Sequence, residues 1–262
     1  MKKYWLILRN SLQTSFAYRA NFFARLFYEG LALVIFSYVW LSLYRSGGSM
    51  GEYTLSSLLA YYLTSAFIRI LTSGGDMGWV IGDEIREGRI STVLLVPISH
   101  YKMNLAKYLG AAVSNIIVFL PVFLFINLFF EFTFLSWRIL PFFFLSLATG
   151  IMVDFTVGYL VGISTFYFGT VQGFNFLVSN FIRFFSGMII PLNLLPRFWQ
   201  VIADFLPFKY INYFPNQVIN SKLSFLEMIH GSLLGLAWVG LSLFLMRVVY
   251  VRGLKRFEGE GI

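Results

Sequence analysis

Long apolar segments alternate with short polar ones along most of the 262 residues of the chain. A helix needs about 20 apolar residues to cross the hydrocarbon core of a membrane, which is about 30 Å thick. By this measure the sequence predicts six membrane-spanning helices, at about residues 22–44, 55–73, 102–130, 139–166, 174–190 and 227–249. The predicted fold class is therefore an all-α membrane protein. No internal repeat divides the sequence, so residues 1–262 are expected to form a single transmembrane domain.

Three segments do not fit the pattern of spanning helices. Residues 1–20 set apolar positions such as Leu8 against basic ones such as Arg9, which predicts an amphipathic helix on the membrane surface. Residues 74–101 carry the densest charge in the chain and predict a polar loop that contains a short helix. Residues 191–226 combine prolines with many aromatic side chains. They are too broken to span a membrane and are expected to form short interfacial or re-entrant helices.

The positions of the basic residues predict the orientation of the chain. Of the 20 Lys and Arg, 13 lie in the N-terminal segment, in the 74–107 region and at the C-terminus. Loops rich in Lys and Arg stay in the cytoplasm. Both termini and the 74–101 loop are therefore expected to be cytoplasmic, and the 191–226 segment extracytoplasmic. The expected location is the inner or plasma membrane of the cell.

Composition supports a membrane location and narrows the range of functions. Hydrophobic residues make up 58% of the chain and charged residues 12%, and the mean hydropathy is +0.74. Soluble domains carry roughly twice that charged fraction. The net charge of +8 could indicate a nucleic-acid partner, but the basic residues cluster at the ends of predicted spans. Membrane orientation explains that clustering better, so membrane lipid and not nucleic acid is the expected partner.

An enzymatic function is not expected. The sequence lacks the G-x-x-x-x-G-K-[ST] loop that cradles the phosphates of ATP. It contains no cysteine, and its two histidines, His100 and His230, lie in different predicted regions. A single histidine at a membrane boundary is usually an interfacial residue, so we predict no metal site.

The charged loop contains the most informative motif of the sequence. It reads Gly82-Asp83-Glu84-Ile85-Arg86-Glu87-Gly88-Arg89-Ile90, then Leu94-Leu95-Val96-Pro97-Ile98-Ser99, and Lys107 follows at the start of the third span. A short charged helix followed by an apolar strip suits docking into a groove of another protein. The alternative is a solvated loop whose charges pair with one another.

This motif resembles the type-2 ATP-binding-cassette permeases. That family carries E-x-R-x-G, then L-L-x-x-P-[IV]-S and a lysine, between its second and third spans. Here Arg89 replaces the usual threonine after the glycine, as in the subgroup whose permeases occur as two related subunits beside one ATPase. A second motif after span five, L-P-x-[WF] flanked by prolines, also agrees. It reads Leu195-Pro196-Arg197-Phe198 here and is followed by Trp199, and the flanking prolines are Pro191 and Pro207.

The resemblance implies a permease subunit without a nucleotide site. Residues 76–98 would form a coupling helix on a separate cytoplasmic ATPase, which would hold ATP and Mg²⁺, whereas this chain would hold no cofactor. A second permease, either a copy of the chain or a sister subunit, would complete the transporter. The transporter would export a hydrophobic or amphipathic substrate such as a drug, lipid, glycan or peptide. The implied coupling residues are Asp83, Glu84, Arg86, Glu87, Gly88, Arg89 and Pro97.

Two charges in predicted spans invite a pairing hypothesis. Asp154 in span four and Arg183 in span five each lie about 15 residues from the turn near Gly169. Both would be roughly 20 Å from that turn, at matching depth in an antiparallel hairpin. Because an unpaired charge inside a membrane is costly, we predict an intramembrane ion pair. The alternative is that Asp154 lines an aqueous pathway alone.

Two further sets of residues could pack spans together. Glu29 could pair with Arg25 one turn before it, and Arg69 could join them or extend to the surface. The pairs Gly158–Gly162 and Gly231–Gly235 have the spacing of close helix contacts, which could include a dimer interface.

Two other classes of function stay open on the sequence. A membrane anchor could recruit a partner through the 76–98 loop without transporting anything. An ion-coupled secondary carrier could use Asp154 and Arg183. Carriers usually place polar groups at broken helices near the membrane midplane, whereas the broken segment of this chain is expected at the outer edge. Dependence of transport on a proton gradient would favour the carrier.

Overall fold

The computed structural model describes the backbone of residues 2–17, 19–47, 53–72, 77–130, 138–170 and 172–257. Within these ranges every element is an α-helix or a short 3-10 helix, so the all-helical prediction is confirmed. The elements are α1 Lys2–Ala17, α2 Arg19–Arg45, α3 Leu55–Leu71, α4 Met77–Arg86, α5 Ile90–Leu94, α6 His100–Phe130, α7 Leu140–Ile163, α8 Thr165–Phe168, α9 Gln172–Phe185, η2 Leu192–Leu194, α10 Arg197–Asp204, η3 Pro207–Tyr210, α11 Tyr213–Ile219 and α12 Phe225–Leu254.

Four stretches within the described helices are long and apolar enough to cross a membrane. They are Leu26–Arg45 in α2, His100–Phe125 in α6, Leu140–Phe168 across α7 and α8, and Phe225–Leu254 in α12. The second predicted span corresponds to α3, a shorter apolar helix of 17 residues. The structure thus supports a helical membrane protein, and the count of six spans stays a prediction.

The fifth predicted span is shorter than expected. Helix α9 has 14 residues and ends at Phe185, five residues before the predicted end at residue 190. Gly187 follows in the left-handed backbone region, with φ of +77°. Glycine adopts this conformation at little steric cost, so the chain turns here and does not continue as a helix.

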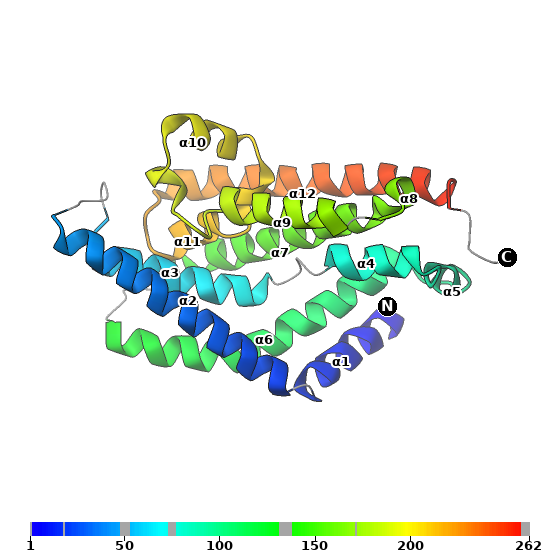
Figure 1. The fold of residues 1–262 in the computed structure, drawn as a ribbon, viewed down its shortest axis with the longest axis horizontal. Helices are drawn as coiled ribbons and strands as arrows, with labels where there is room; N and C mark the ends of the chain where they lie inside the picture. The colour runs from blue at the N-terminus through cyan, green and yellow to red at the C-terminus, as the bar shows by residue number, and fades with distance from the viewer. Residues whose placement is uncertain are drawn as a thin grey trace.

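Helix α7 forms the centre of the molecule. Helices α4, α9, α11 and α12 and the 3-10 helix η3 all pack against it, and α6 packs mainly against α1 and α3 and also contacts α7. Figure 1 shows α7, α9 and α12 running along the length of the molecule. The start of α1 and the end of α12 lie toward the same end as α4 and α5, and α10 and α11 lie toward the other half.

Two glycines of α7 let other backbones approach closely. A Cβ atom on Gly162 would lie 2.6 Å from the Cβ of Ile81 in α4. One on Gly150 would lie 2.6 Å from the carbonyl oxygen of Tyr210 in η3. On α12, Gly235 packs in the same way against Thr149 and Tyr210. All three glycines therefore pack helices within the chain. Two of them, Gly162 and Gly235, belong to the G-x-x-x-G pairs for which a dimer interface was considered.

The N-terminal helix α1 lies along the first half of α6. It contains no buried residue, as expected of a surface helix. The Ser11 hydroxyl donates a hydrogen bond to the Lys107 carbonyl oxygen at 2.6 Å, and the Ser99 amide donates one to the Tyr4 hydroxyl oxygen at 3.0 Å. At Gly110 a Cβ atom would lie 2.6 Å from the Leu8 carbonyl oxygen, so the two helices meet where α6 lacks a side chain.

Substitution of Gly110 by alanine is expected to release α1 from α6. The added methyl group meets the Leu8 carbonyl oxygen at 2.6 Å and the Ser11 Cβ at 2.8 Å, and neither atom can turn away, so the helices must separate at a cost of about 1–3 kcal/mol. Hydrogen exchange of the residue 2–17 amides should become faster, measured by mass spectrometry in detergent. Gly240→Ala is the matched control, because no atom lies within 4 Å of a Cβ at that position. Equal exchange of α1 in both variants would contradict this packing.

Candidate functional site

The charged segment, residues 77–99, folds as α4 and α5 joined by a sharp turn. One face of α4 is buried and contains Ile81, Glu84 and Ile85. Gly88 has φ of +70°, which turns the chain into α5, where Ile90 is fully buried. Burial of the isoleucines against α6, α7 and α12 explains why this short segment is held in a fixed position. Asp76, at the start of the expected coupling helix, lies outside the described residues.

The opposite face of the charged segment is exposed. Arg86 lies 3.0 Å from Asp83, and Arg89 lies 2.6 Å from Glu87, with all four side chains at least about two-fifths exposed. The charges thus pair with one another, as the second interpretation of the sequence anticipated. Such exposed pairs contribute less than about 1 kcal/mol, so they can exchange for charges of a partner at little cost.

An exposed apolar strip follows the charged face. Leu95 is 86% exposed, and Leu94, Val96 and Pro97 are exposed as well. This combination of loosely paired charges and uncovered apolar side chains is typical of a surface that contacts another protein. Of the residues expected to couple, Asp83, Arg86, Glu87, Arg89 and Pro97 lie on this surface, and Gly88 makes its turn.

Glu84 lies on the other side of α4 and points inward. Its carboxylate oxygen Oε2 is 3.1 Å from Nε2 of His100, the first residue of α6. Burial alone would raise the pKa of Glu84, but the hydrogen bond with His100 and the charges of His100, Lys107 and Arg89 outweigh it and lower the pKa. Glu84 is therefore a carboxylate at neutral pH.

His100, expected at a membrane boundary, is the first residue of α6 and points into the protein. It is 2% exposed, and its Nδ1 is 2.7 Å from the hydroxyl of Tyr159 on α7. The Asn104 side chain, one turn further along α6, is fully buried beside it. This pair of polar residues one helical turn apart, at the start of an apolar helix, was the signal in the sequence for an inward-facing polar cluster.

The proline-rich segment forms the short helices η2, α10, η3 and α11, as predicted. Pro196 precedes α10 and Pro207 starts η3, positions where a proline costs no helical hydrogen bond. Trp199 on α10 packs against Phe184 and Phe185 of α9. Pro191 is buried at the start of η2.

The proline-rich segment packs against α3, α7 and α12. Tyr210 contacts Gly150 of α7 and Gly235 of α12, and Asn216 hydrogen-bonds to Ser65 of α3 at 2.9 Å. Each of these three contact positions lies about ten residues, or about 15 Å, from the start of its helix. That is about half of a hydrocarbon core of roughly 30 Å. Contacts with glycines distant in sequence set the position of this segment against the long helices, and proline and aromatic content could not predict those contacts.

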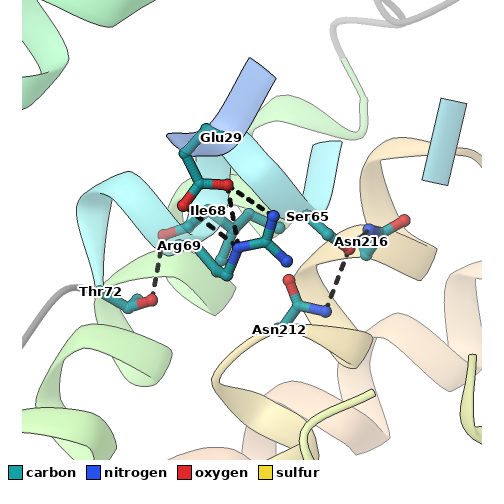
Figure 2. Close-up of polar contacts among 7 residues, drawn as sticks. All are labelled: Glu29, Ser65, Ile68, Arg69, Thr72, Asn212 and Asn216. Atoms are coloured by element: carbon teal, nitrogen blue, oxygen red, sulfur yellow. Dashed lines mark hydrogen bonds and ion pairs between the residues drawn. The ribbon is translucent and has the colours of Figure 1, made fainter. Parts of the chain in front are cut away.

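A buried ion pair lies close to these polar residues. The Arg69 guanidinium on α3 donates to the Glu29 carboxylate on α2, with Nη2 and Oε2 2.6 Å apart. Figure 2 shows this pair beside the Asn212 amide, which donates to Ser65 Oγ at 3.2 Å. Of the two outcomes considered for Arg69, the pairing across the helix hairpin is thus the one formed. The side chain of Arg25 lies outside the described residues.

Asp154 has a different environment from the one expected. Its carboxylate is buried in α7 and accepts a hydrogen bond from the Tyr108 hydroxyl of α6 at 3.0 Å. Arg183 lies on α9 with an exposed side chain, and the ion pairs among the described residues do not include one between it and Asp154. Asp154 and Arg183 are at similar distances along the chain from the turn near Gly169, but this did not bring them together. The rotation of each helix about its axis also decides which side chains meet.

The described residues contain no group of three His, Cys, Asp or Glu side chains that could hold a metal ion. The polar residues brought together in α4, α6 and α7 are a carboxylate, an imidazole and tyrosine hydroxyls. They are buried between helices, whereas the exposed groups of this region are the charges of α4 and the apolar side chains that follow them.

Loss of the Glu29 carboxylate is expected to destabilise the fold. Glu29→Gln leaves the Arg69 charge without its counter-charge between α2 and α3, at a cost of about 2–4 kcal/mol. The free energy of unfolding in detergent, measured by titration with sodium dodecyl sulfate, should fall accordingly. Asp204→Asn is the matched control, because Asp204 is 60% exposed in its 2.7 Å pair with Lys209. That change is expected to cost less than about 1 kcal/mol. Equal losses in both variants would contradict a stabilising intramembrane pair.

Comparison with known proteins agrees with the arrangement of these elements. Residues 31–261 match the sequence model described as ABC-2 family transporter protein. The match begins within α2 and covers α3 to α12, including the charged segment and the proline-rich segment. No curated protein matches the chain. The match covers most of the sequence, so the chain belongs to the ABC-2 family of transporter proteins, as the resemblance implied.

Proposed function

We propose that the chain is the permease subunit of an ATP-binding-cassette exporter, powered by a separate ATPase subunit. The observation that carries this proposal is the way the charged segment is held. Its apolar face is buried against α7, whereas its charges and the apolar strip after them are exposed. Membership in the ABC-2 family supports a permease that works with such a partner.

The charged segment would transmit force from the ATPase to the membrane helices. A movement of the ATPase would push on Arg86, Arg89 and the strip around Leu95, which are exposed. Because Ile81 lies against Gly162 of α7 without an intervening side chain, a push on α4 toward α7 would be passed directly to α7. ATP and Mg²⁺ would be bound by the ATPase, and both chain termini would face the cytoplasm of an inner or plasma membrane.

The proposed substrate is hydrophobic or amphipathic, such as a drug, lipid, glycan or peptide. Large apolar side chains are exposed along α2, including Phe27 and Val34, so this helix could contact lipid, a second permease or the substrate. Export is proposed because the type-2 permeases that the sequence resembles are mostly exporters. A second permease, either a copy or a sister subunit, would supply the other wall of the pathway.

An ion-coupled carrier is the second candidate, and one observation favours it. Asn212, Asn216 and Ser65 form a buried polar cluster about 15 Å from the start of α3, near the Glu29–Arg69 pair. Polar groups at broken helices near the midplane are typical of carriers. The exposed charged segment has no role in a carrier, so we prefer the exporter to the carrier. A membrane anchor would use the same exposed surface without transporting a substrate. A measurement of ATP-driven substrate movement distinguishes the exporter from the anchor.

Reversal of two exposed charges is expected to separate the chain from its ATPase. Arg86→Glu with Arg89→Glu should lower the amount of ATPase that co-purifies in mild detergent by about ten-fold or more, because like charges then face each other across the contact. The rate of ATP hydrolysis by the purified material measures the amount of active ATPase that remains bound. The melting temperature should not change, since both side chains are exposed.

Arg197→Glu is the matched control for this experiment. Arg197 is an exposed arginine on α10, in the half of the molecule away from α4 and α5. Its reversal should leave co-purification and ATP hydrolysis unchanged. If the double variant still co-purifies an active ATPase at the level of the native chain, the charged segment is not the ATPase contact.

A further inference from the structure

Helix α1 carries an exposed apolar stripe beside the face that it turns to α6. The positions that contact α6, among them Tyr4 and Ser11, are partly buried. Trp5 and Phe16 are 64% and 41% exposed. At about 3.6 residues per turn, these two side chains lie within about 20° of each other around the helix. Figure 1 shows α1 at the outside of the helices, next to α6, so this stripe is open to the surroundings of the molecule.

Basic side chains border the apolar stripe. The exposed basic residues at this border are Lys2, Lys3, Arg9 and Lys102. Arg9 and Lys2 lie about 40° and 60° from Trp5 around the helix. Lys102 belongs to the first turn of α6, which the contact of the Ser99 amide with α1 brings to the start of that helix. These basic residues and the stripe together form one surface, the α1 surface.

The basic residues of the α1 surface have no acidic counterpart on their own helices. The sequence contains no Asp or Glu in residues 1–28 or 100–130. Basic residues elsewhere do pair with acidic ones, as Arg69 does with Glu29. The ion pairs among the described residues include none of the four basic side chains of the α1 surface. Their counter-charge therefore comes from outside the chain.

The α1 surface also begins where a membrane boundary is expected. The stretch His100–Phe125 of α6 is long and apolar enough to cross a membrane. The Ser99 amide, just before this stretch, donates to the Tyr4 hydroxyl of α1. The first turns of α1, which hold Trp5 and most of the basic residues, thus lie beside the start of the stretch. Lipid headgroups are found at that level, and tryptophan is enriched there.

We propose that the α1 surface binds anionic phospholipid headgroups of the leaflet on the N-terminal side of the chain. Four Lys or Arg residues on an amphipathic helix are sufficient to attract anionic lipid. Trp5 and Phe16 enter the boundary between headgroups and acyl chains, and the arginine and lysine side chains contact lipid phosphates. A neutral bilayer accepts the apolar stripe equally well but supplies no counter-charge. The preference for anionic lipid is therefore what the basic residues add, and it does not rest on the proposed transport function.

Hydrogen exchange of the full chain in lipid nanodiscs tests the proposal without an ATPase. Discs of phosphatidylcholine are compared with discs that also contain phosphatidylglycerol. The amides of residues 2–17 should exchange at least about three-fold more slowly in the anionic discs. This gain in protection should disappear in about 1 M salt, where charges are screened beyond about 3 Å. The amides of α12 are the internal reference for intact folding.

Removal of the charges of α1 should abolish the gain. The variant carries Lys2→Gln, Lys3→Gln and Arg9→Gln together. It should exchange in phosphatidylcholine discs as the native chain does, because these exposed side chains do not hold the fold. In the anionic discs it should show no further protection of α1.

A second triple variant is the matched control. Arg138→Gln, Arg197→Gln and Lys222→Gln together remove the same charge from exposed positions outside α1. This variant should keep the gain in protection of residues 2–17. If it loses the gain as well, the net charge of the chain and not the α1 surface attracts the lipid, and the proposal is overturned.

The apolar stripe is tested by Trp5→Gln. This variant should speed exchange of α1 by about three-fold in both kinds of disc, because the helix loses its largest contact with lipid. It should keep the gain from phosphatidylglycerol, since the charges remain. Unchanged exchange in both discs would show that the stripe does not contact lipid.

Two further outcomes would overturn the proposal. One is equal exchange of α1 in the two kinds of disc for the native chain, or a gain that the variant without the charges of α1 keeps. The other is protection of α1 that appears when the ATPase is added and not when phosphatidylglycerol is present, which would make the α1 surface a protein contact.

Discussion

The close approach of other backbones to α7 at two glycines is the constraint on which the rest of the structure depends. Gly162 admits α4 at one end of the helix, and Gly150 admits the proline-rich segment near its middle. A side chain at Gly162 would displace α4, and a side chain at Gly150 would displace the proline-rich segment. Neither of these elements contains a long apolar helix. The same helix therefore contacts both α4 and the proline-rich segment, which join α7 at different points along its length.

This packing also explains where polar side chains can be buried. The segment held on Gly150 brings Asn212 and Asn216 to Ser65 of α3, where each amide finds a hydrogen-bond partner. The α2–α3 contact in turn pairs Glu29 with Arg69. In a membrane an unpaired polar group is costly, so each of these contacts holds its two helices in one relative position. The chain thus has a polar contact near the middle of α3 and another, around His100, at the charged segment.

Much of the fold could be predicted from the sequence, because it depends on local pattern. Apolar length marked the helices that could span, charge density marked α4 and α5, and prolines with aromatic residues marked η2 to α11. The contacts of the proline-rich segment could not be predicted, since they are made with glycines distant in sequence. For the same reason the end of α9 was placed too late: Gly187 adopts a left-handed conformation that apolar content does not reveal.

The candidate site was predicted in part. The exposed face of α4 follows from alternating charged and apolar positions, but that pattern did not reveal that Glu84 points inward to His100. A residue's direction on a short helix depends on the element against which it packs, here α7. Asp154 shows the same limit, since Tyr108 of α6 approaches it from a helix outside the hairpin that depth matching considered.

The most direct test of the central claim is a cross-link between the charged segment and the ATPase. The chain has no cysteine, so a single one can be introduced at Leu95, which is 86% exposed beside the charged face. Phe205, 75% exposed after α10, is the comparison site in the other half of the molecule. With a photoreactive thiol reagent in native membranes, we predict a cross-link from Leu95→Cys to an ATP-binding-cassette ATPase and none from Phe205→Cys. A cross-link to the ATPase from Phe205→Cys and none from Leu95→Cys would contradict the account.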